Sequence, residues 1–290
     1  MASGLVDQYV TTLIPSAYDR SVVSERRAAI EEALDNCALD AGLMFESGSW
    51  SHGTALAGHS DVDLMAWASG LQPTRPSSAL AAMKSALQGS HWAIANLRVS
   101  SPTVQVRFMG PPHFEVVPAW LHANNDGESR VFQIPGPGDR WTESAPSPHL
   151  RFVTQQNERL NKRVKPLARL LKQWKAHTGA PVSSFYLEMR TAAYAKTQSS
   201  IFYHLDLTIL IDDLITSGLP DMNDPTGYVS RIHAVSSEEN RRTTLQLLRE
   251  AKHKHHLDEA YELDGRADTK TTYWLAMADV FGNDFPYQPW

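Results

Sequence analysis

Apolar positions in the first hundred residues follow two different spacings. They recur every three to four residues over 5–13, 22–41 and 77–87, which is the spacing of one face of an α-helix. Residues 62–67 instead form a short apolar run typical of a strand. This alternation of helices and strand predicts an α/β region.

Two more strands are predicted by short runs rich in β-branched residues, 103–108 and 114–117, each bounded by Pro or Gly. We expect both to pair with the strand at 62–67. Between residues 121 and 149 the chain contains clusters of Asn, Asp, Gly and Pro, which favour loops. The sequence therefore predicts irregular structure and a domain boundary in this segment.

The second half of the chain is predicted to be helical. Apolar residues with helical spacing occupy four segments, 152–177, 185–197, 205–217 and 238–261. We therefore expect an α/β domain over residues 1–150 and a helical domain over residues 151–290.

Composition narrows the class of protein. The 290 residues are 42% hydrophobic and 20% charged, as in ordinary globular chains. The formal net charge of -5 argues against a protein that mainly coats nucleic acid, but it allows a small anionic substrate bound with a metal ion. No segment approaches the roughly 20 apolar residues that a membrane span needs. We expect a cytoplasmic protein with no membrane association.

The first chemical signal is a pair of carboxylates, Asp61 and Asp63, at the start of the strand at 62–67. Residues two apart in a strand point to the same face, so the two charges lie side by side and repel each other. A divalent cation relieves this repulsion, and oxygen ligands without Cys or His favour Mg²⁺, with Mn²⁺ as the alternative, over zinc. Alone, such a pair is a weak signal.

Small residues precede the pair and make the signal more specific. Gly48 and Ser49, followed by Gly53-Thr54, allow backbone N–H groups to approach phosphate oxygens, and Ser49 adds a hydroxyl donor. A Walker-type loop is excluded because no Gly-Lys-Ser/Thr follows these glycines. Phosphates are therefore expected to be held by this segment and by metal.

A third carboxylate, Glu115, completes the predicted metal site. A site with two metal ions needs another ligand for the ion that activates the attacking hydroxyl. Glu115 lies inside an apolar strand, where a charge without such a role is costly. Asp61, Asp63 and Glu115 together predict a nucleotidyltransferase that holds two Mg²⁺ ions. Each acid taken alone is explained as well by a surface charge or a helix cap.

The segment from Gly48-Ser49 to Asp61-Val62-Asp63 resembles the bacterial cGAS/DncV-like nucleotidyltransferases, or CD-NTases, of the cyclic GMP-AMP synthase and oligoadenylate synthetase superfamily, which include the SMODS-type synthases of cyclic oligonucleotides. The resemblance covers about residues 45–227. It is also carried by residues 134–135, 141–149, 169–174, 183–188 and 224–226.

This resemblance implies an α+β fold in which a polymerase-β-like core with a mixed sheet is followed by a C-terminal helical domain, as two lobes with a central cleft. It implies synthesis of a cyclic di- or trinucleotide from nucleoside triphosphates, ATP among them, with release of pyrophosphate. The product would signal phage infection in a CBASS pathway and activate an effector that this chain does not contact directly.

Three residues of the helical half acquire roles only through the resemblance. Lys172 would touch the donor triphosphate, Ser184 would bind phosphate and Phe185 would stack on the base. Each has a simpler alternative: Lys172 as a solvated helix lysine, Ser184 or its neighbour Ser183 as a helix N-cap, and Phe185 as a core aromatic.

The chain departs from the superfamily pattern at two points. Many relatives have aspartate where this chain has Glu115. The single cysteine, Cys37, cannot supply the zinc-binding insertion with which the animal sensor recognises duplex DNA, so activation by DNA is not expected. We also expect the chain to be a monomer. Two other functions stay open: transfer of one nucleotide to RNA, protein or a small molecule, and a catalytically silent nucleotide-binding module.

Overall fold

A computed structural model of the chain describes every residue except 1, 36, 126–128, 265–268, 284 and 286–290. The chain forms two compact units. The sheet unit contains Pro15–Arg151 and Thr226–Ser230, and the helical unit contains Met1–Ile14, Phe152–Pro225 and Arg231–Trp290. The first helix is therefore grouped with the helical unit, although it precedes the sheet in sequence.

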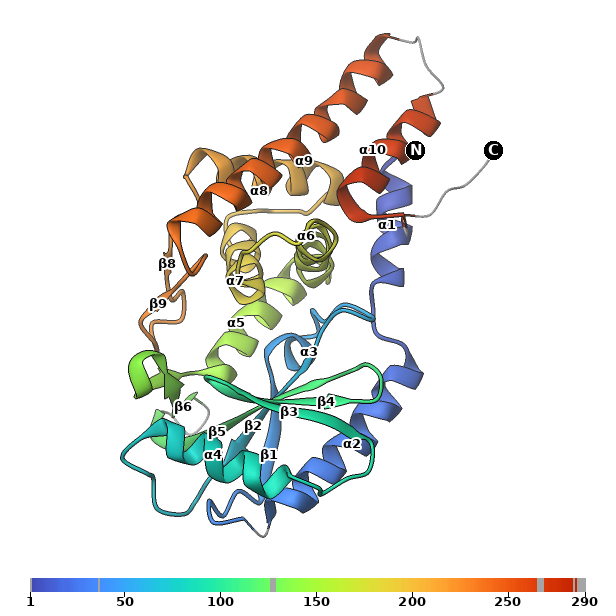
Figure 1. Cartoon of the computed structure of the whole chain (residues 1–290). Helices are drawn as coiled ribbons and strands as arrows, with labels where there is room; N and C mark the ends of the chain where they lie inside the picture. Colours follow the sequence, from blue (N-terminus) through green and yellow to red (C-terminus); the bar gives the residue numbers. More distant parts are fainter. Residues whose placement is uncertain (1, 36, 126–128, 265–268, 284, 286–290) are drawn as a thin grey trace. The chain divides into compact units, whose positions relative to one another are not determined.

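The sheet unit is built on a mixed β-sheet (Figure 1). The strands lie in the order β1 (Leu43–Ser47), β2 (Val62–Trp67), β5 (Phe114–Asn125), β4 (Thr103–Phe108) and β3 (Ile94–Ser100). Strands β2 and β5 are parallel, and the other neighbours are antiparallel. The predicted strands are confirmed, as is the mixed α+β class. The expected pairing of 114–117 with 62–67 is confirmed, since β5 pairs with β2. The expected pairing of 103–108 with 62–67 is wrong, because β5 lies between β4 and β2.

The expectation of irregular structure over residues 121–149 is wrong. Strand β5 continues to Asn125, and its second half pairs with β6 (Ser129–Gly136), which pairs with β7 (Arg140–Ser144). Pro135 and Gly136 belong to β6, and Pro137 and Gly138 lie in the turn between β6 and β7, where Gly138 adopts a φ of 67°. Buried Phe132 anchors this extension to the sheet. The loop-forming composition therefore marks a short turn rather than a long loop.

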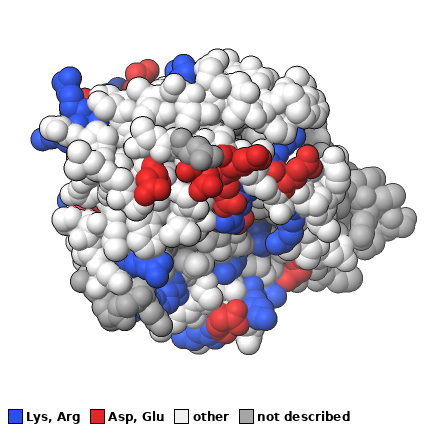
Figure 2. All heavy atoms as spheres, turned by 90° about the horizontal axis from the view of Figure 1, so that it is seen from below, with Lys and Arg blue, Asp and Glu red and all other residues white. Residues whose placement is uncertain are grey.

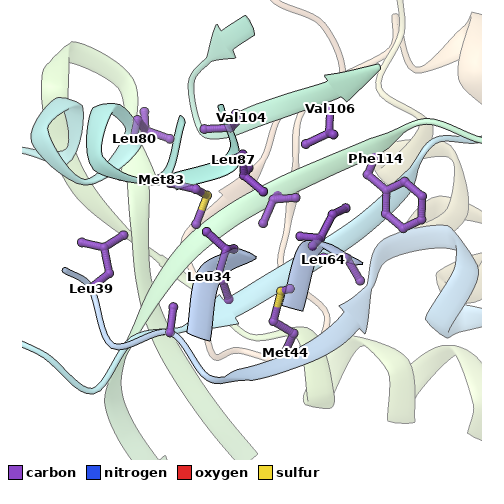
Figure 3. Packing of buried hydrophobic residues seen from close by; sticks show 14 of the residues in the cluster. Leu34, Leu39, Met44, Leu64, Leu80, Met83, Leu87, Val104, Val106 and Phe114 are labelled. Atoms are coloured by element: carbon purple, nitrogen blue, oxygen red, sulfur yellow. The ribbon is translucent and has the colours of Figure 1, made fainter. Parts of the chain in front are cut away.

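One face of the sheet is covered by two helices, α2 (Ala17–Asp35) and α4 (Pro76–Leu87) (Figure 3). Alternate side chains of the central strands point into this core, because strand residues alternate between the two faces. The strand residues buried here include Val62, Leu64, Val104, Val106, Phe114 and Val116. The residues between them are therefore placed on the opposite face, where the candidate carboxylates lie.

The helical unit (Figure 1) confirms the predicted helices with one change. Its elements are α1 (Ala2–Thr12), the part of α5 (Pro146–Arg159) from Phe152 onward, α6 (Val164–Thr178), α7 (Ser184–Ala195), α8 (Tyr203–Thr216), β8 (Met222–Asn223), β9 (Arg231–Ile232), α9 (Glu238–Asp264) and α10 (Thr269–Phe281). The single helix predicted over 152–177 is two helices. They are separated where Asn161 and Lys162 adopt positive φ, a conformation that cannot continue a right-handed helix.

Two surface properties bear on function. Among the described residues, none of the helices is both long enough and apolar enough to span a bilayer. The face shown in Figure 2 carries acidic and basic side chains in small groups separated by larger uncharged areas. This pattern agrees with the modest negative net charge and not with a continuous nucleic-acid-binding surface on that face.

The core beneath the sheet makes a direct stability prediction. We expect Leu64→Ala to lower the free energy of unfolding by about 3–5 kcal/mol, because Leu64 is fully buried and the truncation leaves a cavity. Leu71→Ala is the matched control, since Leu71 is 94% exposed and should change stability by about 0.5 kcal/mol or less. Urea unfolding followed by tryptophan fluorescence measures both. Equal effects would contradict the assigned core.

Candidate active site

The three predicted carboxylates share one face of the sheet. Strands β2 and β5 are parallel, and their register places Asp63 directly opposite Glu115. Asp61 lies just before β2, two residues from Asp63, so it belongs to the same face. Residues far apart in the sequence are thus brought together by one strand pairing.

Gly48 lies against Asp63 and explains why a glycine is needed there. Ser47 at the end of β1 pairs with Asp63, and the next residue begins the short helix α3 (Gly48–His52) with a φ of 58°. A Cβ at Gly48 would lie 2.0 Å from Oδ2 of Asp63. Any side chain at this position would displace the carboxylate, so Gly48 is required by both conformation and space. Ser49 follows in the same turn and is half-buried.

Strand β4 supplies two polar side chains to this face. Arg107 Nη1 lies 3.4 Å from Oδ1 of Asp61, and Gln105 Nε2 donates a hydrogen bond of 2.9 Å to Oε1 of Glu115. Gln105 is also the register partner of Glu115 across β4 and β5. The sequence motif did not point to Gln105 or Arg107. The two residues lie two apart on β4, which is the spacing of side chains on one face of a strand.

His113 adds a neutral group beside Asp61. Burial, followed by the positive charge of Arg107, lowers the pKa of His113 from its usual value, although the charge of Asp61 acts in the opposite direction. The Nδ1 atom of His113 is buried and has no hydrogen-bond partner among the described residues. We infer that the imidazole is uncharged at neutral pH and that, of these two neighbours, Arg107 is the one that balances Asp61.

The donor set fits a hard divalent cation. It consists of carboxylate oxygens from adjacent strands, which suit Mg²⁺ or Mn²⁺ better than softer metals. Within the described residues, however, no three His, Cys, Asp or Glu side chains are gathered into a ready-made cage. Arg107 forms an ion pair with one oxygen of Asp61, Oδ1. Binding of a cation at that oxygen requires Asp61 to exchange this partner.

The predicted residues of the helical unit lie in a different setting. Lys172 on α6 is 4% exposed, and its Nζ lies 2.5 Å from Oε2 of Glu188 on α7. It is therefore not the solvated lysine of the simpler alternative. Phe185 is half-buried in the first turn of α7. Their proposed contacts with nucleotide stay predictions.

Ser183 and Ser184 have separate tasks at the start of α7. The side chain of Ser183 caps the helix by accepting a hydrogen bond from the backbone N–H of Tyr186. Ser184 Oγ accepts a hydrogen bond of 2.6 Å from Nζ of Lys175. Burial, followed by the charge of Lys172, lowers the pKa of Lys175 from its usual value. The sequence motif pointed to Lys172 and gave no signal for Lys175, which lies one turn further along α6.

Comparison with known families gives one match. The sequence profile of the family described as "Second Messenger Oligonucleotide or Dinucleotide Synthetase domain" matches residues 5–157, more than half of the chain. This range contains the three carboxylates and strands β1 to β7 of the sheet unit. No protein with a curated description matches the sequence significantly.

Several solved structures share the fold. CdnC of E. coli MS115-1, solved with ATP, superimposes with a TM-score of 0.76 at 17% identity, and the match covers 98% of each chain. CdnG of Bradyrhizobium diazoefficiens, solved with GTP, has a TM-score of 0.73 at 12% identity over 98% of this chain and 96% of that one.

DncV of Vibrio cholerae, solved with the linear intermediate 5′ pppA(3′,5′)pG, has a TM-score of 0.68 at 14% identity over 98% of this chain and 85% of that one. At these identities the likeness establishes the fold, that of the polymerase-β-like CD-NTases.

The close approach of Gly48 to the Asp63 carboxylate can be tested by comparison with Gly58, which has no such neighbour. Gly58 has a φ of 73°, and a Cβ added there would meet nothing within 4 Å, so Gly58→Ala should cost only the backbone strain of about 1–2 kcal/mol. Gly48→Ala should cost more and should also weaken Mn²⁺ binding about tenfold or more, because the Asp63 carboxylate must move. Urea unfolding and Mn²⁺ titration measure the two effects. Equal Mn²⁺ affinities would contradict the assigned contact.

The buried pair on α6 and α7 makes a second prediction. Glu188→Leu deprives Lys172 of its carboxylate partner and should destabilise the protein by about 3–5 kcal/mol. The double variant Lys172→Met/Glu188→Leu removes both charges and should recover most of that loss, because an apolar pair often replaces a buried ion pair at little cost. Denaturant unfolding measures both variants. A double variant as unstable as the single one would show that the pair itself is not responsible.

Proposed function

The chain belongs to the family of Second Messenger Oligonucleotide or Dinucleotide Synthetase domains, and from this premise we propose that it is a templateless nucleotidyltransferase that makes a cyclic di- or trinucleotide from nucleoside triphosphates. One observation carries the proposal beyond family membership. The parallel register of β2 and β5 sets Asp63 opposite Glu115, with Asp61 on the same face. Carboxylates clustered in this way serve no packing purpose and suit a site for divalent ions.

Asp61, Asp63 and Glu115 would hold two Mg²⁺ ions, which supply charge stabilisation at the attacking and leaving oxygens. The backbone at Gly48 and Ser49 would bind the donor phosphates next to Asp63. An acceptor ribose hydroxyl attacks the α-phosphorus of the donor, its O–P bond forms, and the bond to pyrophosphate breaks. The hydroxyl proton passes to solvent water as the O–P bond forms, pyrophosphate takes the electron pair of the broken bond, and no covalent enzyme intermediate is needed.

The helical unit offers cationic and hydroxyl groups for the donor phosphates. In the proposal Ser184 binds phosphate and Phe185 stacks on the base. The family resemblance assigns Lys172 to the triphosphate. Its buried pairing with Glu188 favours Lys175, which is half-buried and already bonded to Ser184, as the lysine that reaches the substrate.

The bound molecules of the solved relatives support nucleotides as substrates. ATP is present with CdnC, GTP with CdnG and a linear dinucleotide triphosphate with DncV. We propose that this chain likewise uses ATP or GTP and passes through a linear intermediate. We further propose that it acts as a cytoplasmic monomer in anti-phage (CBASS) signalling, where its diffusible product activates a separate effector.

Incubation with labelled ATP, GTP, CTP and UTP plus Mg²⁺ or Mn²⁺, followed by phosphatase, tests the proposal. Phosphatase-resistant product is expected, because a cyclic product has no terminal phosphate. A product sensitive to phosphatase, or label transferred to RNA or protein, would indicate transfer of a single nucleotide. Binding of nucleotide without any product would indicate a catalytically silent module and would overturn the proposal.

Asp61→Asn should abolish this product while leaving the fold intact, because it removes one ligand charge without changing side-chain volume. The loss should exceed the roughly 10- to 100-fold that removal of an outer-shell partner causes. Asp35→Asn is the control, since Asp35 is an exposed aspartate at the end of α2 in the same unit. Undiminished product from Asp61→Asn would exclude the assigned metal site.

A further inference from the structure

Two side chains of β4 act on the carboxylates in opposite ways. Gln105 and Arg107 lie two residues apart on the strand next to β5 and therefore point to the same face as Glu115. Gln105 donates a hydrogen bond to Glu115, whereas Arg107 forms an ion pair with Asp61. The neutral amide of Gln105 leaves the negative charge of Glu115 intact, whereas the guanidinium of Arg107 offsets the negative charge of Asp61.

The hydrogen bond from Gln105 restricts the conformation of the longer glutamate side chain at position 115. The glutamate side chain is one methylene longer than aspartate and has one more rotatable bond, so more conformations must be given up when it binds an ion. A carboxylate can only accept hydrogen bonds, so the Gln105 amide must present its N–H group to Oε1 at 2.9 Å. Because Oε1 is engaged in this way, Oε2 is the better placed oxygen for an ion.

The Arg107 contact has the opposite consequence. The Arg107 guanidinium lies 3.4 Å from Oδ1 of Asp61 and supplies, at that oxygen, the positive charge that a divalent ion would otherwise supply. The side chains of Arg107 and Asp61 are 40% and 32% exposed, so water screens the ion pair and Asp61 can exchange Arg107 for another partner. Arg107 therefore competes with a cation for Asp61 without closing the site.

We propose that β4 sets the metal affinity of this site: Gln105 is a positioning residue that holds Glu115 in its metal-binding conformation, and Arg107 is a built-in competitor that limits metal binding at Asp61. The inference rests on the proposed function only in that Asp61, Asp63 and Glu115 bind the divalent ions. It deepens that function by assigning the control of ion occupancy to residues outside the motif.

The two roles predict changes of opposite sign. We would titrate each purified variant of the 290-residue chain with Mn²⁺ in the absence of nucleotide and follow the free ion by electron paramagnetic resonance. Gln105→Met keeps an unbranched side chain but loses the donor, and it should weaken Mn²⁺ binding about tenfold. Arg107→Met should strengthen binding by about two- to fivefold, which is the range for an exposed ion pair.

A matched control is available in the same unit. Gln133 on β6 accepts a hydrogen bond of 2.9 Å from the side chain of Gln72, far from the carboxylates in the strand register. Gln133→Met removes a side-chain amide of the same kind and should leave Mn²⁺ affinity unchanged. Weakening in both glutamine variants would indicate a general loss of folding and would overturn the assignment of Gln105.

A double-mutant cycle tests whether Gln105 acts through Glu115. Glu115→Gln should itself weaken Mn²⁺ binding, and adding Gln105→Met should then weaken it no further, because no carboxylate remains to be positioned. Additive losses, or a Gln105→Met variant that binds Mn²⁺ like the natural chain, would overturn the positioning role. Unchanged or weaker binding in Arg107→Met would overturn the competing role.

The product assay separates failure of this inference from failure of the proposed function. A chain that forms cyclic product but binds Mn²⁺ without dependence on Gln105 retains the function and loses the inference. A chain that makes no product but shows the opposite-sign changes retains the metal site and the inference and loses the synthase assignment. A natural chain that binds no Mn²⁺ overturns both.

Discussion

The parallel pairing of β2 with β5 is the constraint on which the candidate site depends. It sets Val62 and Leu64 beside Phe114 and Val116 in a core covered by α2 and α4, and the same register sets Asp63 opposite Glu115 on the other face. A shift of one residue would exchange the two faces, burying the carboxylates and exposing the core. The hydrophobic free energy of the core therefore also fixes the geometry of the acids.

Clustering carboxylates on one face opposes folding, and the structure shows what offsets the cost. The apolar face gives a large gain, since each buried side chain of this size contributes about 1.5–3 kcal/mol. On the polar face, Arg107 balances Asp61, Gln105 donates to Glu115, and Asp63 lies in the space that Gly48 leaves. These neighbouring groups offset the repulsion between the three carboxylates. The carboxylates can therefore keep this arrangement before a cation binds.

The sequence indicated the candidate residues whose placement depends on their own strand. It did not indicate those whose placement depends on how one strand or helix pairs with another. Asp61 and Asp63 follow from period-two spacing, and Glu115 from the cost of a charge in an apolar strand. Gln105 and Arg107 were not found, because the register of β4 against β5 is set by packing and carries no motif. Lys175 was missed for a related reason: its partner Ser184 lies on another helix. The error over residues 121–149 has the same origin, since Phe132 is buried against the sheet and holds β6 and β7 where Pro and Gly predicted a loop.

The two units deal with charge in contrasting ways. The helical unit pairs Lys172 with Glu188 in its interior, whereas Lys175 donates to the neutral hydroxyl of Ser184, which leaves its positive charge unbalanced by that contact. The candidate site of the sheet unit has the opposite excess, with three carboxylates beside the guanidinium of Arg107. Within the sheet unit, the carboxylates suit a divalent cation, because a hard cation prefers oxygen ligands. Within the helical unit, taken by itself, the ammonium of Lys175 suits an anionic group. Each unit therefore retains charge of one sign at these residues, and the two signs are opposite.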